Sequence, residues 1–276
     1  MSESPAALID IGANLGHKSF QHDLDTVLDE ARSAAIEHII VTGTDLDSIA
    51  RAMQLAQTYP GYLTMTAGFH PHVASEFDEQ ASQAIRQYLA DPRVVAVGET
   101  GLDFNRNYSP RDQQEQAFNR HLELAAECNK PVFLHQRDAH DSFYAILKSC
   151  RSQLAGGVVH CFTDTREALY HYLDLDMYIG ITGWICDERR GRELQGLVAD
   201  VPADRLLLET DAPYLLPRSL KPAPRSRRNE PKYLLEVLAT VARCTGRSAE
   251  NIARETSANA RRLFGLEDIA AADQPG

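Results

Sequence analysis

Residues that can bind a metal ion follow several apolar runs of this 276-residue chain. VVAVGE ends at Glu99, PVFLH ends at His135 and GVVH ends at His160, while other runs lead to His70 and Asp211. An ionised carboxylate at the end of a buried strand needs a cation or several donors beside it, because its desolvation is costly. We therefore expect a compensating group opposite Glu99.

The spacing within these runs suggests that the polar groups converge. Side chains two positions apart on a strand share a face, so apolar residues are expected to lie beneath each polar one. These are Val95 and Val97 before Glu99, Phe133 before His135, and Val158 before His160. If all three faces point inward, one carboxylate and two imidazoles meet. Mixed N and O donors suit Zn, Mn or Fe and, less typically, Mg.

The acids near the last apolar run admit more than one role. Asp211 is expected across the mouth of the site from Glu99, where it could bind a second ion or act as general base towards a water made acidic by the metal. Glu209, and likewise Asp10 near the N-terminus, are more simply interpreted as hydrogen-bonded core carboxylates.

Short apolar runs alternate with amphipathic segments such as 23–37, 78–90 and 111–129, whose apolar residues recur at helical spacing. The short apolar runs are eight expected strands, and none has a clear solvent face. This pattern predicts an α/β fold, a (β/α)8 TIM barrel. An open doubly wound sheet is the alternative, but the chain has no GxGxxG or Walker pattern. The expected strands are 8–14, 38–44, 63–69, 94–100, 131–136, 157–162, 177–183 and 205–211. We expect one domain over 1–266 and a flexible tail over 267–276.

Composition excludes several classes of protein. The chain has 43% hydrophobic and 24% charged residues, with no run long enough to span a membrane. The N-terminus lacks the features of a secretion signal, and five widely spaced cysteines suggest reduced thiols, so we expect a cytoplasmic protein. A net charge of −11 argues against non-specific coating of nucleic acid or anionic membrane.

A local basic stretch departs from this acidic balance. Residues 216–233 contain six Lys/Arg against one acid and follow the last expected strand, on the side where TIM barrels carry their chemistry. Such a loop is often only a solvated surface, but it could bind phosphate here. The arginines that could bind phosphate are Arg137, Arg189, Arg190, Arg227 and Arg228. The aromatic residues on which bases could stack, if they do not belong to the core, are Phe69, Phe104, Trp184 and Tyr214.

The chain resembles the TatD family of metal-dependent deoxyribonucleases. The resemblance is carried by DIGANL, AGFHPH, VGETGLDF, PVFLHQRDA, VVHCFTDT, YIGITGW, ETDAPYLLP and RRNEP, and it runs from about Leu8 to Leu266. It implies a barrel of the amidohydrolase type and a divalent-metal, Mg-supported nuclease that removes nucleotides from 3′ ends of single-stranded DNA and RNA. By position, Glu99, His135 and His160 fall on metal-binding residues, Asp211 on the strand-eight aspartate, and His70 and His72 on the active-site loop histidines.

One departure from the family pattern concerns the first strand. Most members have a His-x-His pair there, whereas this chain has Gly12 and Asn14. Glycine has no side chain to bind an ion, and asparagine offers a neutral amide oxygen. We therefore expect one tightly held ion, most simply Mg2+ with Mn2+ or Zn2+ as alternatives, and a weak or absent second one.

The expected reaction is metal-assisted hydrolysis of a terminal phosphodiester by a monomer. Asp211 would take the proton from water, while His70 or His72 with a nearby arginine would stabilise charge on the phosphoryl group. Two alternatives remain open: an amidohydrolase-like enzyme acting on a small ester, lactone or amide, and a non-catalytic binding scaffold. Degradation of oligonucleotides, turnover of esters and binding of divalent ions distinguish the three.

Overall fold

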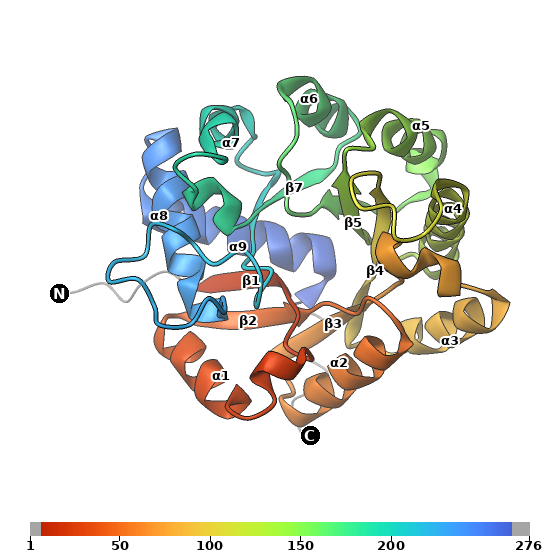
Figure 1. The fold of residues 1–276 in the computed structure, drawn as a ribbon, viewed down its shortest axis with the longest axis horizontal. Helices are drawn as coiled ribbons and strands as arrows, with labels where there is room; N and C mark the ends of the chain where they lie inside the picture. Colours follow the sequence, from red (N-terminus) through yellow and green to blue (C-terminus); the bar gives the residue numbers. More distant parts are fainter. Residues whose placement is uncertain (1–6, 267–276) are drawn as a thin grey trace.

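Eight parallel strands form a central barrel with helices outside it (Figure 1). A computed structural model describes residues 7–266. The strands are β1 (Leu8–Ala13), β2 (Ile36–Val41), β3 (Leu63–Ala67), β4 (Val94–Asp103), β5 (Val132–Arg137), β6 (Gly157–Val159), β7 (Tyr178–Ile181) and β8 (Leu206–Leu208). The α-helices are α1 (Leu24–Ser33), α2 (Leu46–Thr58), α3 (Glu79–Leu89), α4 (Arg111–Cys128), α5 (His140–Cys150), α6 (Arg166–Asp174), α7 (Arg192–Leu197), α8 (Leu234–Thr245) and α9 (Ala249–Phe264).

The strands pair in chain order from β1 to β8, each parallel to the next. The barrel closes between β1 and the segment after β8, where the Asn14 amide donates to the Ala212 carbonyl at 2.6 Å and the Asp211 amide donates to the Gly12 carbonyl at 2.8 Å. The predicted barrel is thus confirmed, and each expected strand is present. The tail expected at 267–276 lies outside the described residues.

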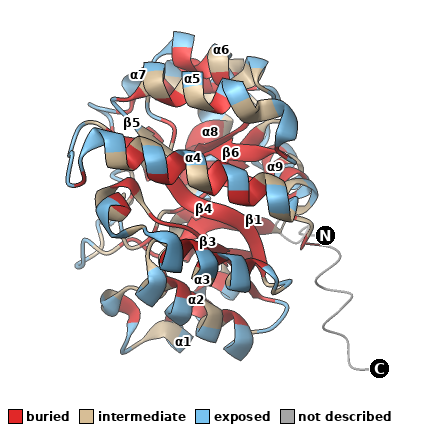
Figure 2. Ribbon diagram, turned by 90° about the vertical axis from the view of Figure 1, so that its right-hand side faces the viewer, coloured by how far each residue is buried: buried red, intermediate tan, exposed pale blue. Residues whose placement is uncertain are grey.

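The strands are buried and are drawn red in Figure 2. Two layers of apolar side chains, one on each face of the sheet, account for this burial. The outer layer joins the strands to the surrounding helices. The inner layer fills the barrel with residues such as Ile11, Val95, Phe133 and Val158, together with Phe264 from α9. Helix α9, which contacts β1 and β8, therefore contributes to the barrel interior and not only to the outer shell.

The expected alternation along β4 is wrong at one position. Val95 belongs to the inner layer as predicted, but Val97 packs in the outer layer against the helices. The pairing of β4 with β5 shifts register between Val97 and Thr100, and an irregularity of this kind re-aims the side chains that follow it. At Gly98 a Cβ would lie only 2.1 Å from the Phe133 carbonyl oxygen, so the irregularity requires glycine. Glu99 faces the site because of this shift.

Two further observations concern the class of protein. Within residues 7–266, no helix has the length and apolarity needed to cross a membrane. All five cysteines lie in this range, and each is a free thiol.

Candidate metal centre

Glu99 lies at the centre of a group of histidines at the carboxyl ends of the strands. Its Oε1 atom is 3.3 Å from His70 Nε2, 3.0 Å from His135 Nδ1 and 2.8 Å from His160 Nε2. The four side chains come from the ends of β4 and β5 and from the residues after β3 and β6. The structure therefore brings together the three predicted metal ligands Glu99, His135 and His160.

His70 joins this group more closely than the sequence analysis anticipated. It caps the 3-10 helix η2 (Pro71–Glu76), and its Nδ1 accepts a hydrogen bond from the His72 amide at 3.1 Å. This contact leaves Nε2 to face Glu99. One ligand atom each from His70, Glu99 and His135 lie within 4.8 Å of one another, a spacing that suits a single divalent ion. The donor chemistry, imidazole nitrogens around one carboxylate, fits such an ion.

Buried carboxylates lie behind two of the metal-site histidines, but only the one behind His160 is within hydrogen-bond distance. His160 presents Nε2 to Glu99, and its Nδ1 lies 3.3 Å from Glu209 Oε2. His135 presents the opposite atom, Nδ1, to Glu99, and its Nε2 lies 3.6 Å from Asp103 Oδ2. A carboxylate beside the far ring nitrogen sets the tautomer of a ligand histidine and raises its basicity.

Glu209 is itself held in place from a second side. Its Oε1 accepts a hydrogen bond from the Cys161 amide at 2.6 Å. The interpretation of Glu209 and Asp10 as hydrogen-bonded core carboxylates is confirmed, since Asp10 accepts from the amides of Gly12 and Thr210. Glu209 has in addition a contact with His160 that the sequence did not reveal.

Burial makes the electrostatics of the site unusual. Burial alone would raise the pKa of Glu99, but the charge of His160 and the hydrogen bonds from His135 and His160 hold that pKa well below its usual range. Burial lowers the pKa of His70 to about 4 against the attraction of Glu99. Glu99 and His70 are thus in the state that a divalent cation requires of its ligands. Against their burial, the neighbouring carboxylates raise the pKa of His135 and of His160, so these two rings must release a proton when an ion binds.

Asp211 lies across the cavity and belongs to a different local network. Its Oδ1 accepts a hydrogen bond from Asn14 Nδ2 at 3.0 Å. Burial raises the pKa of Asp211 to about 8; the charge of His160 opposes this rise, and that of Glu99 adds to it. The structure thus places Asp211 in the same hollow as the metal group, while the compact set of ligand atoms consists of His70, Glu99 and His135 and contains neither Asp211 nor His160.

Position 12, at the end of the first strand, has no room for a histidine in this structure. A Cβ at Gly12 would lie 2.7 Å from Glu209 Oε2 and 2.9 Å from Phe133 Cζ. The space that a larger side chain would need is therefore filled by Glu209 and Phe133.

Two adjoining hollows open around the centre. The first, of about 660 Å3, lies over the ends of β1–β4, and the second, of about 370 Å3, lies over the ends of β5–β8. They share six residues, among them the metal-site histidines: His135, Arg137, His160, Cys161, Asp211 and Tyr214. The centre therefore lies where the two hollows meet.

The predicted phosphate arginines are not gathered together. Arg137 lines both hollows, and its guanidinium has no hydrogen-bond or ion-pair partner among residues 7–266. Arg228 instead binds Asp23 at 2.7 Å and Glu230 at 2.8 Å, which makes it a structural cation and no longer a candidate.

The other three arginines also differ from one another. Arg190 pairs with Asp187 at 2.9 Å and covers the ring of Trp184, Arg189 lies 3.9 Å from Glu188, and Arg227 is exposed on the loop after β8. None of these three lines either hollow.

Several residues of the site were missed by the sequence analysis. Arg106 and Tyr108, in the loop after β4, line the first hollow. Asp103 binds His72, whose Nε2 lies 2.7 Å from Asp103 Oδ2. The only sequence signal for them is that they follow the strand that carries Glu99, because loops at this end of a barrel form the site.

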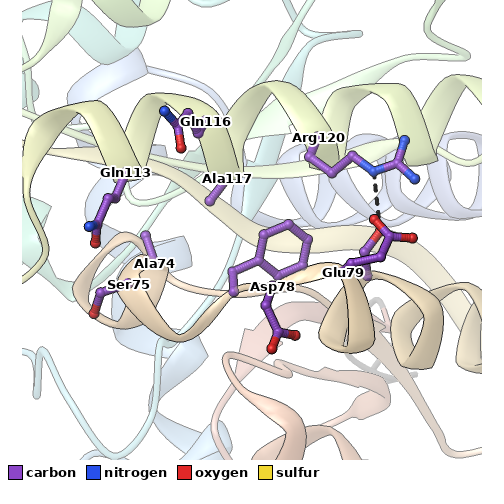
Figure 3. A pocket seen from close by; sticks show the side chains of 10 residues that line it. Ala74, Ser75, Asp78, Glu79, Gln113, Gln116, Ala117 and Arg120 are labelled. Carbon is purple, nitrogen blue, oxygen red and sulfur yellow. Dashed lines mark hydrogen bonds between the residues drawn. The ribbon is translucent and has the colours of Figure 1, made fainter.

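A further hollow, of about 380 Å3, lies outside the barrel between η2, α3 and α4 (Figure 3). Arg120 donates to Ser82 Oγ across it at 3.2 Å, and Ala74 and Ala117 contribute small side chains. No residue of the metal centre lines it, so we assign it no part in the chemistry.

Comparison with known proteins agrees with this geometry. The family model described as TatD related DNase matches residues 9–265. The chain is 50% identical to a Klebsiella pneumoniae protein named 3′-5′ ssDNA/RNA exonuclease TatD, over 94% of this chain and 98% of that one, and 52% identical to the protein of the same name from Erwinia billingiae, over 94% and 99%.

Solved structures give the same picture. The Escherichia coli TatD homologue YjjV superposes with a TM-score of 0.85 at 29% identity, covering 94% of this chain and 98% of that one. N-isopropylammelide isopropylaminohydrolase from Burkholderia multivorans, at 13% identity and a TM-score of 0.61 over 94% of this chain and 74% of that one, shares the fold alone. With a matching family model over nearly the whole chain and relatives at half identity, the protein belongs to the TatD-related DNase family.

Proposed function

We propose that this protein is a divalent-metal-dependent 3′-5′ exonuclease that hydrolyses phosphodiester bonds of single-stranded DNA and RNA. The observation that carries the proposal is the contact of one carboxylate oxygen, Glu99 Oε1, with three imidazole nitrogens at the mouth of the barrel. The relatives at half identity carry the corresponding name.

Four side chains would hold the ion: Glu99, His70, His135 and His160. When bound, a divalent cation supplies positive charge to a phosphoryl oxygen and makes a nearby water more acidic. Glu209 would keep Nε2 of His160 directed at the ion through its contact with Nδ1, while Asp103 places a negative charge 3.6 Å from Nε2 of His135.

The remaining groups act on the substrate and its proton. Asp211 faces the same cavity, where Asn14 holds it in place. The positive charge of a bound ion would lower its raised pKa, and the ionised carboxylate would then accept a proton from water. Arg137, whose guanidinium is unpaired within the described part of the chain, binds phosphate where the two hollows meet. His72, which lies beside His70 and binds Asp103, donates towards the charge that develops on the phosphoryl group.

The ion, the compartment and the oligomeric state complete the proposal. Mg2+ is the proposed ion, although imidazole donors also suit Mn2+ and Zn2+. Five free thiols accord with a reducing compartment, and we propose the cytoplasm. We also propose that the protein acts as a monomer, because one chain supplies Glu99 and the three histidines around it and the site needs no residue from a second copy.

The test is digestion of 5′-labelled single- and double-stranded oligomers with Mg2+, Mn2+, Zn2+ or a chelator. A ladder that shortens from the 3′ end of the single strand, and stops with chelator, is expected. Intact oligomers in every metal, with turnover of simple esters, would instead assign the site to a small-molecule hydrolase.

A further inference from the structure

The two hollows beside the metal centre differ in charge, although they share the residues of the centre. The first hollow contains Arg106, whose guanidinium makes no hydrogen bond or ion pair among residues 7–266. Its additional acid, Asp45, caps α2 and accepts from the Ser48 amide at 2.7 Å, so the positive end of a helix offsets its charge. This hollow therefore suits a chain that carries further phosphates.

The second hollow has the opposite character. Asp138 and Asp164 line it, and neither has an ion-pair partner within the described range. Their carboxylates accept from neutral amides instead: Asn105 Nδ2 donates to Asp138 at 2.6 Å and Gln136 Nε2 donates to Asp164 at 2.8 Å. Asp164 also accepts from the Thr165 amide at the start of α6, at 2.7 Å. No cationic side chain among residues 7–266 pairs with either acid, so two unpaired carboxylates lie beside the metal centre.

The cations near the second hollow do not remove this charge. Arg111 lies over the Phe104 ring and donates to Asn107, and Arg190 is paired with Asp187. The shared Arg137 is the only arginine that lines the hollow. The hollow also carries Trp184 and Tyr214, aromatic side chains of the kind on which bases and sugars rest.

We propose that the second hollow binds the 3′-terminal nucleoside, and that Asp138 and Asp164 exclude ends that carry a 3′-phosphate. This inference rests on the proposed exonuclease function. When the last phosphodiester lies at the metal, the terminal nucleoside on one side of it bears no further phosphate, while the rest of the chain on the other side bears many. Only the hollow without a free cation of its own matches the nucleoside, and its two carboxylates repel an added dianion. The polynucleotide then runs through the first hollow past Arg106.

The experiment compares degradation of two 5′-labelled single strands that differ only in a 3′-hydroxyl or a 3′-phosphate end. The wild-type protein is expected to shorten the 3′-phosphate strand at least about tenfold more slowly. In Asp138→Asn/Asp164→Asn this ratio is expected to fall several-fold. Both changes keep the shape of the side chain, and Asn tolerates the positive φ of 53° at position 138.

The control for each single variant is Asp174→Asn, which removes one negative charge from an exposed position at the other end of α6 and should keep the wild-type ratio. Both single variants and their thermal unfolding are measured beside the double variant, so a folding defect is recognised. Equal wild-type rates on the two ends, or an unchanged ratio in well-folded variants, would overturn the inference. Failure of the wild type to degrade either strand would overturn the exonuclease function as well.

Discussion

Glu209 Oε2 lies 3.3 Å from Nδ1 of His160, on the side of the ring that faces away from Glu99. Without an ion, His160 Nε2 donates to Glu99. When an ion is bound, the contact with Glu209 would keep the proton on Nδ1 and leave the lone pair of Nε2 to the ion. Since Oε1 of Glu209 accepts from the Cys161 amide, the carboxylate has both oxygens engaged. Glu209 therefore acts through His160 as a positioning residue.

Glu209→Gln should reverse the tautomer of His160. The Cys161 amide would keep the oxygen of the new side chain, so its amide nitrogen would donate to His160 Nδ1 and place the proton on Nε2. We expect affinity for the divalent ion to fall by about 10- to 100-fold, with little change in fold. Titration with Mn2+ followed by calorimetry measures this; an affinity equal to that of the wild type would show that Glu209 only fills space.

Glu99→Ala should remove activity on single-stranded DNA and metal binding together, because Glu99 contacts all three histidines. Asp211→Ala should remove activity while leaving an ion bound, since Asp211 is not among the side chains that contact Glu99 Oε1. Nuclease rates and metal content of the purified variants separate the two roles. Near-wild-type turnover by either variant contradicts its assignment.

One tightly held ion per chain is expected after dialysis. Gly12 offers no ligand, and Asn14 directs its Nδ2 to Asp211. Elemental analysis measures the ion content. Two tightly bound ions per chain would show that a second site forms without a histidine on β1.

The fold could be predicted from the sequence because its signals are local. Eight apolar runs separated by amphipathic helices permit few arrangements, and strand-terminal residues such as His135 and His160 were found by alternation alone. Alternation failed at Val97, because the register shift depends on the close approach of Gly98 to β5, a contact between segments distant in sequence. The alternation of residues along a single strand contains no information about such a contact.

The parts of the site that were not predicted depend on loops. His70 was expected to act on the substrate, but the turn into η2 directs its Nε2 at Glu99. Arg228 was considered for phosphate because of its basic neighbours, and only the tertiary structure shows that Asp23 lies beside it. A count of charges along the sequence does not reveal an ion-pair partner that is distant in the sequence.

Arg137→Ala and Arg228→Ala should therefore have different effects. Loss of the unpaired Arg137 should weaken binding of single-stranded DNA roughly tenfold and reduce its salt dependence. Loss of Arg228 should lower the thermal midpoint, because Asp23 and Glu230 lose their partner, and leave DNA affinity nearly unchanged. Fluorescence anisotropy at several salt concentrations and thermal unfolding test both. A stronger effect of Arg228 than of Arg137 on binding would contradict the placement.

Asp10 should make the stability of the protein depend on pH. Burial raises the pKa of Asp10 to about 7, against the hydrogen bonds from Thr210 and Gly12. The folded protein therefore holds a proton that the unfolded chain, with a pKa near 3.8, releases. The stabilisation is complete below about pH 4 and is lost as pH rises to about 7, by a total on the order of 4 kcal/mol.

Asp10→Asn should remove this contribution. An amide mimics the protonated acid, since it can accept from the Thr210 amide and donate to Thr210 Oγ1, which lies 2.5 Å from Asp10 Oδ2. The variant should be more stable than the wild type at pH 8 and close to it at pH 4 to 5. Urea unfolding across this range measures the difference. A difference that is constant with pH would mean that Asp10 is ionised in the folded protein, and that its hydrogen bonds outweigh its burial.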